Sequence, residues 1–347
     1  MKAAVFMEPR RMEVREVETP RCGPGEVRIK VMACAICGTD IRIYNHGHHN
    51  VKPPQIIGHE IAGIVDEVGS SVKDLREGDH VIVVTSIPCG RCAFCQKGSP
   101  NLCIDFKAIG YHYPGGFAQY MVMPEEGVRA GNIMKIPDNL PFNEASLVEP
   151  LSCVINGQSY LNISLADSVL IIGAGPIGCM HAELARAKGA TKVMMSDVSV
   201  ERLDIARGFG IDRLINPTQE SLEKVVAEET DGAGVNVVIV ACSSGKAQED
   251  ALKVVATQGR ISFFGGLPKD NPYINFNSNI IHYKEVSVHG AFASYPSQYK
   301  QALSIIATKR VDASRFITAT FPLDRIVEAI ATAQKAEGLK MVINPWQ

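Results

Sequence analysis

The chain has 347 residues, enough for two domains with substantial cores, and carries a formal net charge of -2 with 21% charged residues. This balance argues against a nucleic-acid surface, which needs a strongly basic face. No apolar run reaches the roughly 18 residues that cross a bilayer, and Met1 to Phe6 leads at once into charged residues rather than a signal peptide. We therefore expect a cytoplasmic protein that binds neither nucleic acid nor membrane.

Residues 1 to about 150 are typical of a mostly β domain. Between Glu26 and Ala33 apolar residues alternate with charged ones, which predicts a strand with one buried face. Further short strands, separated by glycine and proline turns, are expected at 1–6, 61–68, 80–84 and 117–123. This punctuation favours an antiparallel, partly closed barrel. A short helix is expected at 142–148, stopping before Pro150 because proline disfavours helical geometry at the preceding residue.

Four of the ten cysteines fall within 15 residues, namely Cys89, Cys92, Cys95 and Cys103. In a reducing compartment this spacing indicates a metal rather than disulfides, and four thiols suit a tetrahedral zinc sphere. Four thiolates leave no open position for a substrate, so the zinc expected at 89–103 is structural. The alternative is four reduced cysteines packed as small apolar groups.

A second set of candidate metal ligands is dispersed and consists of Cys37, His59, Glu60 and Glu149. Sulfur, imidazole and carboxylate donors make a mixed sphere with room for a water or an alcohol, as a catalytic zinc needs. The alternatives are that His59 is a core histidine and Cys37 an inert apolar residue. Neighbouring side chains on a regular strand point to opposite faces. For His59 and Glu60 to reach one metal, the backbone must therefore leave strand geometry there.

From residue 168 strands and helices alternate, which predicts a parallel, doubly wound sheet and an α/β fold class. The expected strands are 168–172, 192–196, 214–215, 235–241, 259–264 and 285–290. The expected helices are one that ends at Lys188 and others at 200–208, 221–229 and 248–255. Helices at 297–309 and 324–336 and a strand at 340–343 complete the chain.

The first strand of this sheet runs into the glycine-rich turn Gly173-Ala-Gly-Pro-Ile-Gly178. Gly173 would make the tight turn, Gly175 would let the backbone approach a pyrophosphate, and Gly178 would let the helix pack closely on the sheet. The helix, which starts around Pro176 and Ile177, would offer free N–H groups to the phosphates. The alternative is that these glycines only turn a tight βαβ unit.

Asp197 follows Gly178 by 19 residues, close to the separation at which an acid meets the adenosine ribose diol. A carboxylate there should also repel a 2'-phosphate. The expected cofactor is therefore NAD rather than NADP.

In this order, the motifs resemble those of the zinc-dependent medium-chain dehydrogenases: Cys37-Gly-Thr-Asp40, Gly58-His-Glu60, the four-cysteine segment, Glu149-Pro150 and Gly173 to Gly178. Within that family the sequence is most similar to the polyol branch of sorbitol and L-iditol dehydrogenases and to the threonine dehydrogenases. The resemblance implies a GroES-like, mostly β catalytic domain of residues 1–155 and 297–347, and a Rossmann NAD-binding domain of residues 156–296. It also implies two zinc ions per chain, one catalytic and one structural, and a homodimer or homotetramer.

The resemblance makes Cys37, His59 and Glu60 the catalytic zinc ligands, with Glu149 bonded to the metal directly or through its water. Whether the two glutamates bind together or by turns stays open. Thr39 is the residue expected to accept the hydroxyl proton, unless its hydroxyl bonds its own backbone.

Arg42 stands where many relatives carry a relay histidine, and arginine cannot shuttle a proton because it stays charged. His46 could take that role, although a surface histidine is the alternative. Arg42 and His46 also open a run of basic residues without an acid before Glu60. If this run faces the cleft, it favours a carboxylate or phosphate on the substrate; the alternative is a solvated loop.

Arg202 resembles the residue that lies against the adenine in relatives, and it raises the question of NADP. Its alternative is an exposed residue in the first turn of a helix.

The complete set of candidate ligands favours an NAD-dependent zinc enzyme that oxidises a secondary alcohol of a polyol or sugar derivative. Rival hypotheses are oxidation of L-threonine or 2,3-butanediol and, from another class, a nucleotide-binding protein without catalysis.

Overall fold

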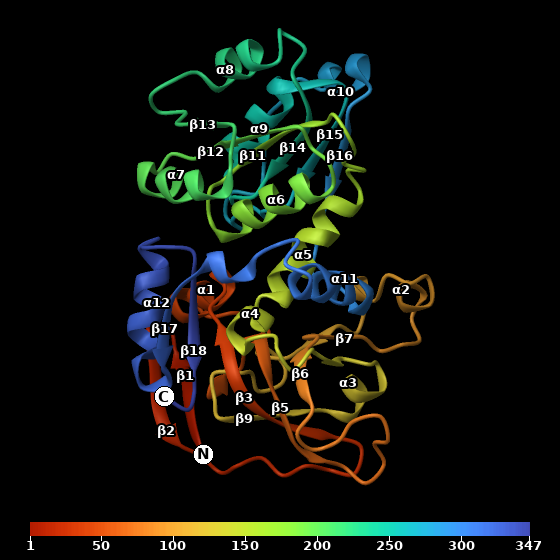
Figure 1. Cartoon of the computed structure of the whole chain (residues 1–347), viewed down its shortest axis with the longest axis vertical. Helices are drawn as coiled ribbons and strands as arrows, with labels where there is room; N and C mark the ends of the chain where they lie inside the picture. The colour runs from red at the N-terminus through yellow and green to blue at the C-terminus, as the bar shows by residue number, and fades with distance from the viewer. The chain divides into compact units, whose positions relative to one another are not determined.

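The computed structural model describes residues 1–347, which form two compact units (Figure 1). The first unit consists of Met1–Ser152 and Ala293–Gln347, and the second consists of Cys153–Phe292. Both ends of the chain therefore belong to the same unit, and the second unit is an insertion in its sequence.

Short strands dominate the first unit. Seven of them form one sheet: β3 (Val27–Ala35), β5 (Glu60–Val68), β6 (His80–Val83), β9 (Tyr120–Met123), β10 (Ile133–Lys135), β17 (Ile317–Pro322) and β18 (Lys340–Asn344). Five others form a three-stranded and a two-stranded sheet: β1 (Lys2–Glu8), β2 (Arg11–Glu16), β4 (Gln55–Ile56), β7 (Ser86–Ile87) and β8 (Lys107–Ala108). In the larger sheet the C-terminal strand β18 pairs antiparallel with β3, so both ends of the chain complete it.

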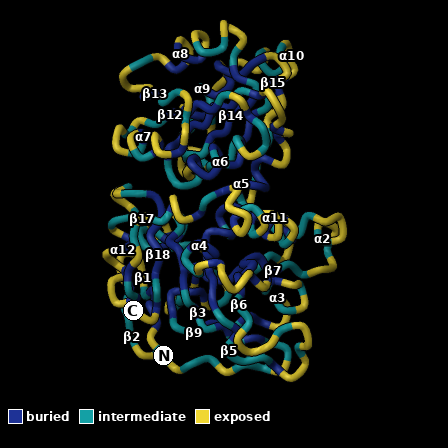
Figure 2. Tube along the Cα trace, in the orientation of Figure 1, coloured by how far each residue is buried: buried dark blue, intermediate teal, exposed yellow.

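The predicted alternation along β3 is visible as alternating burial. Val27, Ile29 and Val31 are fully buried, whereas the charged residues between them are only half-buried. These side chains join the apolar core of the first unit, which appears dark blue along the tube in Figure 2. Burying each of them contributes about 1.5–3 kcal/mol, so this face of the sheet holds β3 and its neighbours in register.

Helices of the first unit lie at the ends of these strands and in the connections: α1 (Gly38–His46), α2 (Ala93–Gln96), α3 (Glu125–Arg129), α4 (Phe142–Ser146), α11 (Pro296–Ala307) and α12 (Ile326–Gln334). Short 3-10 turns occupy Pro100–Leu102, Ala313–Phe316 and Leu323–Arg325. The helix predicted at 142–148 ends at Ser146, and a further helix that was not predicted, α5 (Val148–Ser159), follows it. Pro150 lies in the first turn of α5, where a missing N–H has no helical partner to lose.

The second unit is a doubly wound parallel sheet. Its strands are β11 (Ser168–Ile172), β12 (Lys192–Ser196), β13 (Arg213–Ile215), β14 (Val235–Val240), β15 (Val255–Phe263) and β16 (Ser287–Gly290). Its helices are α6 (Pro176–Ala187), α7 (Val200–Ala206), α8 (Leu222–Glu229), α9 (Gly245–Val254) and α10 (Asn279–Lys284), with a 3-10 turn at Arg207–Phe209. The strand order β13-β12-β11-β14-β15-β16 reverses between β11 and β14. Ligands of such sheets bind at this reversal, beyond the carboxyl ends of the strands.

The predicted α/β class is confirmed, with a mostly β unit and a parallel doubly wound unit. The apolar residues of β11 and β14 are all buried, as expected for strands covered on both faces. None of the helices is both long and apolar enough to cross a membrane.

Candidate functional site

Three of the predicted metal ligands converge in the first unit. The Cys37 sulfur, a ring nitrogen of His59 and a carboxylate oxygen of Glu60 lie within 4.8 Å of one another, and His59 and Glu60 are buried. Cys37 is the N-cap of α1, and Glu60 is the first residue of β5. Sulfur, nitrogen and oxygen donors gathered in this way are a set that zinc accepts, so these side chains fit the ion.

The backbone just before His59 explains how two sequence neighbours reach one point. His59 lies outside β5, and Gly58 before it adopts a φ of 95°. A Cβ on Gly58 would come within 2.9 Å of the Phe117 ring and 3.0 Å of the Cys34 sulfur. Only glycine suits this left-handed, crowded position. The resulting irregular turn frees His59 from the alternation of the strand that begins at Glu60.

Asp40, which the sequence analysis did not single out, orients this centre. Its buried carboxylate accepts a hydrogen bond from the Cys37 N–H at 2.9 Å and places Oδ1 3.3 Å from His59 Nδ1. Burial alone would lower the pKa of His59, but the charge of Asp40 and the nearby Tyr111 raise it well above its ordinary value. With Asp40 at Nδ1, Nε2 is the atom left to bind a metal. The Cys-x-x-Asp spacing, which forms a capping box, is the sequence signal for this role.

Lys340 is a second residue that sequence reasoning missed. Its Nζ donates hydrogen bonds to both carboxylate oxygens of Glu60 and to the Ile36 carbonyl at 3.0 Å. Burial alone would lower the pKa of Lys340, but Glu60 and Cys37 raise it above its ordinary value. Lys340 lies 280 residues beyond Glu60 in the chain, so no local pattern announces this pair.

Glu149 lies in the first turn of α5, near the three converging ligands but not among them. Its charge acts on Lys340 and on Tyr111, which places the carboxylate in the electrostatic surroundings of the centre. The ring of Tyr111 lies 5.6 Å from that of His59. Burial raises the pKa of Tyr111 to about 12, so its hydroxyl keeps its proton beside the centre.

The other candidate residues near Cys37 all lie on α1. Thr39 is half-buried in the first turn of this helix, two residues after Cys37. Arg42 and His46 are exposed and lie one helical turn apart. Of these three side chains, only Thr39 is therefore partly shielded from solvent.

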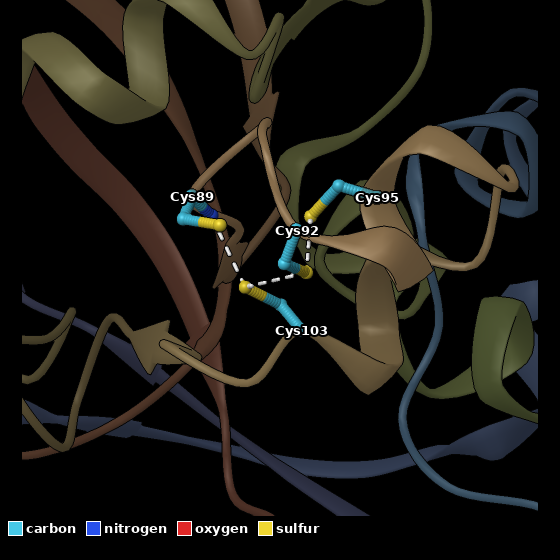
Figure 3. Close-up of side chains that lie close together, drawn as sticks. All are labelled: Cys89, Cys92, Cys95 and Cys103. Carbon is cyan, nitrogen blue, oxygen red and sulfur yellow. Dashed lines mark hydrogen bonds between the residues drawn. The ribbon is translucent and has the colours of Figure 1, made fainter.

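The four-cysteine segment forms a separate cluster in the first unit (Figure 3). The Cys92 sulfur lies 3.5 Å from that of Cys95 and 3.9 Å from that of Cys103, and the Cys89 N–H donates to the Cys103 sulfur at 3.2 Å. Backbone N–H groups of Cys95 and Ile104 lower the pKa of Cys92 to about 6. Four converging sulfurs with amide donors aimed at them fit a closed tetrahedral zinc.

The glycine-rich turn of the second unit joins β11 to α6. Gly173 has a φ of 116°, and Gly175 is the N-cap of α6, with Pro176 as the first helical residue. A Cβ on Gly178 would lie 1.8 Å from the Gly173 carbonyl oxygen, so the helix could not approach the turn with any other residue there. The free N–H groups at the start of α6, around Ile177, can bind a phosphate.

Asp197 follows β12 and lies directly beside this turn. Its Oδ2 accepts a hydrogen bond from the Ala174 N–H at 2.7 Å, and Oδ1 accepts one from the Ser199 N–H at 2.9 Å. The Nη1 atom of Arg202 would be 3.2 Å from a Cβ on Gly175, so this guanidinium lies over the turn. The predicted cofactor residues are therefore gathered at the reversal of the strand order.

Comparison with known proteins assigns the family. Residues 23–138 match the alcohol dehydrogenase GroES-like domain, and residues 176–308 match the zinc-binding dehydrogenase family. An L-threonine 3-dehydrogenase of Thermococcus kodakarensis is 38% identical over 96% of this chain and 94% of its own length. The chain belongs to the zinc-dependent medium-chain alcohol dehydrogenases.

Two further proteins of this kind are similar to the chain over nearly its whole length. A sorbitol dehydrogenase of Bacillus subtilis is 32% identical over 99% of this chain and 97% of its own. The crystal structure of a zinc-binding dehydrogenase of Sinorhizobium meliloti bound to NADP has a TM-score of 0.92 and 31% identity, with 99% of each chain covered. The expected family and enzyme class are confirmed: the protein is a zinc-dependent alcohol dehydrogenase that uses a nicotinamide cofactor.

Proposed function

We propose that this dehydrogenase oxidises a secondary alcohol of a polyol or sugar derivative to the ketone, with NAD as the hydride acceptor. The observation that carries the proposal is the buried convergence of Cys37, His59 and Glu60. These residues would hold the catalytic zinc, and Glu149, whose charge acts on Lys340 and Tyr111, would assist or replace Glu60. The bound ion would supply Lewis-acid chemistry that makes an alcohol acidic near neutral pH.

The side chains of the centre have separate roles in this proposal. Asp40 lies at Nδ1 of His59 and would leave Nε2 for the metal, and Lys340 holds the Glu60 carboxylate. Thr39 would accept the hydroxyl proton while it passes its own hydroxyl proton on to solvent, because it lies two residues after Cys37 and is half-buried.

Arg42 cannot carry the proton further because guanidinium does not titrate in the working range. His46 is exposed one turn further along α1, and we assign the release of the proton to solvent at that residue.

The choice of NAD over NADP rests on Asp197. Its carboxylate lies beside the glycine-rich turn, where a 2'-phosphate would meet a negative charge. Arg202 would lie against the adenine, and it supplies an opposing argument because a guanidinium also attracts phosphate. The similar dehydrogenase of Sinorhizobium meliloti, whose crystal structure contains NADP, supplies a second.

The remaining assignments concern the architecture. Cys89, Cys92, Cys95 and Cys103 would bind a structural zinc that holds residues 89–103 in place. We assign residues 1–155 and 297–347 to the GroES-like catalytic domain, and residues 156–296 to the Rossmann domain.

We also infer a homodimer or homotetramer. Exposed apolar side chains on and beside the edge strand β16, such as Val288 and Phe292, support such an assembly.

Oxidation of L-threonine is the second candidate, because the relative from Thermococcus kodakarensis bears that name at 38% identity. A panel of polyols, sugar acids, sugar phosphates, 2,3-butanediol and amino acids, scored by NADH formation, separates the candidates. Activity should vanish with a zinc chelator and return with zinc. If L-threonine is the only substrate that yields NADH, oxidation of L-threonine replaces the polyol proposal. If no alcohol reduces either NAD or NADP, the proposal is overturned.

A further inference from the structure

We propose that the alcohol oxidised by this enzyme carries an anionic group, a phosphate ester or a carboxylate, bound by a basic patch beside the metal centre. This inference rests on the proposed oxidation of a secondary alcohol and names the class of alcohol. The patch, called here the histidine patch, consists of His48, His49, Lys52, Lys107 and His112. The rings of His48 and His49 are neighbours, and His49, Lys52 and Lys107 act electrostatically on His112.

Tyr111 links the metal centre to the histidine patch. Its ring centroid lies 5.6 Å from that of His59 and 5.4 Å from that of His48. The ring of His49 lies 4.3 Å from that of His48. Tyr111 is therefore a neighbour of both the metal centre and the patch, and the separation is one that a substrate of a few carbon atoms can span.

The patch is built from two turns that hold each other in place. In the first, the Val51 N–H donates to the His48 carbonyl at 2.9 Å; in the second, the His112 N–H donates to the Ala108 carbonyl at 2.9 Å. The Gln55 side-chain amide joins them by donating to the Tyr111 carbonyl at 3.0 Å. The patch is thus preorganised, which lowers the entropy lost when a ligand binds.

Two imidazoles of the patch are fixed as hydrogen-bond donors. Nδ1 of His48 accepts from the Asn50 N–H at 3.2 Å, and Nδ1 of His112 accepts from the Ala108 N–H at 3.2 Å. An accepting Nδ1 leaves the proton of a neutral ring on Nε2. In the neutral form each ring therefore carries its proton on Nε2, and the exposed His112 can offer that N–H group to an oxyanion.

The charges of the patch decide in favour of an anion over a neutral hydroxyl group. Burial, and then the positive charge of Lys107, lower the pKa of His112, and His49 and Lys52 act in the same direction. The two lysines therefore lie close enough to His112 to disfavour its protonation, with Asp105 as the opposing acid. His49, Lys52 and His112 are exposed, so a ligand can reach them. A bound phosphate or carboxylate would relieve this repulsion, whereas a polyol hydroxyl would not.

Steady-state kinetics with NAD test the inference, with sorbitol, sorbitol 6-phosphate, gluconate and L-threonine as substrates. We expect at least one of the anionic substrates to exceed sorbitol in kcat/KM by about tenfold or more at low salt, with the advantage shrinking as salt screens the charges. The phosphate and carboxylate substrates distinguish the two sources of negative charge. Equal or better use of neutral sorbitol would overturn the inference and leave the oxidation of a secondary alcohol intact.

A binding measurement keeps the inference testable even if none of these alcohols is oxidised, the outcome that would overturn the proposed function. Inorganic phosphate should shift the imidazole proton resonances of His48, His49 and His112 in the zinc-loaded protein. Unchanged resonances up to high phosphate concentration would contradict the histidine patch as an anion site.

The double variant Lys52→Gln/His112→Gln should lower the kcat/KM ratio of anionic to neutral substrate by about tenfold, since two charge-assisted contacts are removed. Lys73→Gln, which removes a positive charge from an exposed lysine elsewhere in the same unit, is the matched control and should leave the ratio unchanged. A ratio that falls equally in both variants, or in neither, would overturn the assignment of these residues.

Discussion

At the scale of single residues, the centre depends on charges that are buried together. Lys340 and Glu60 are both almost completely inaccessible, at 2% and 0% exposure, and each supplies the opposite charge that the other needs. Removing one partner of such a pair is costly because the remaining charge has lost its hydration and has no counter-charge. A metal ion at Glu60 would supply a second positive charge, so zinc and Lys340 would support the same carboxylate.

Replacing Lys340 by methionine should therefore destabilise the zinc-free protein by about 3–5 kcal/mol, and the zinc-loaded protein by less. Urea unfolding with and without a chelator measures both values. Lys2→Met removes the exposed ion pair with Asp324 and serves as the control with little expected change. If Lys340→Met were as mild as this control without zinc, the ion pair would have no structural role.

His181 supplies a pH dependence that is independent of the metal. Burial, and then the charge of Lys188, lower the pKa of His181 to about 3. The unfolded chain takes up a proton near pH 6.5, whereas the folded one does not. Stability is therefore present above that pH and is lost as the pH falls. Between pH 7 and pH 5 this single group should reduce the free energy of unfolding by about 2 kcal/mol.

The variant His181→Gln should remove this part of the pH dependence. Glutamine keeps an acceptor for the Gln158 amide, which lies 3.2 Å from Nδ1 of His181. Urea unfolding of both proteins at pH 7 and pH 5, followed by a probe in the second unit, gives the difference directly. If the free energy of unfolding falls by the same amount in both proteins between pH 7 and pH 5, His181 does not cause this pH dependence.

At the scale of elements, the contact between α6 and β11 depends on the absence of one side chain. A Cβ on Gly178 would overlap the Gly173 carbonyl oxygen, so Gly178→Ala must push the start of α6 away from the turn. The N–H groups that face the phosphates would move with it. We expect the dissociation constant of NADH to rise about tenfold or more, because helix N-terminal contacts weaken steeply when they are misplaced.

Fluorescence titration with NADH measures this effect, and Gly208→Ala is the matched control. Nothing lies within 4 Å of a Cβ built on Gly208. Unchanged NADH binding in Gly178→Ala would mean that the turn tolerates a shifted helix and that the close approach is dispensable.

At the scale of the whole molecule, the candidate ligands of both zinc sites lie in the first unit and the nucleotide residues lie in the second. Alcohol oxidation, which needs the metal, and NADH binding should therefore be separable. Chelation should abolish dehydrogenase activity while the affinity for NADH changes by less than about twofold, because each compact unit keeps its own core. Fluorescence titration of the chelated protein checks this outcome. Loss of NADH binding on chelation would show that the nucleotide site depends on the metal.

Much of the fold could be predicted because its signals are local. Alternation along β3, the buried apolar runs of β11 and β14, and the glycine-rich turn each appear within a few consecutive residues, and the predicted α/β class is confirmed. The same holds for the candidate cysteine cluster, whose members span a short segment. Helix α5 was not predicted because proline usually marks the end of a helix. Pro150 instead lies in the first turn of α5, where its missing N–H breaks no helical hydrogen bond.

The sequence by itself determined which residue types were available for a metal and a nucleotide, and in what order, because spacing within a motif is a property of the chain alone. Only the tertiary structure decided their neighbours. Lys340 meets Glu60 because β18 pairs with β3, which also pairs with β5, and His48 meets Tyr111 because two turns pack together. Such contacts depend on how distant segments pack, and no short stretch of sequence encodes that packing.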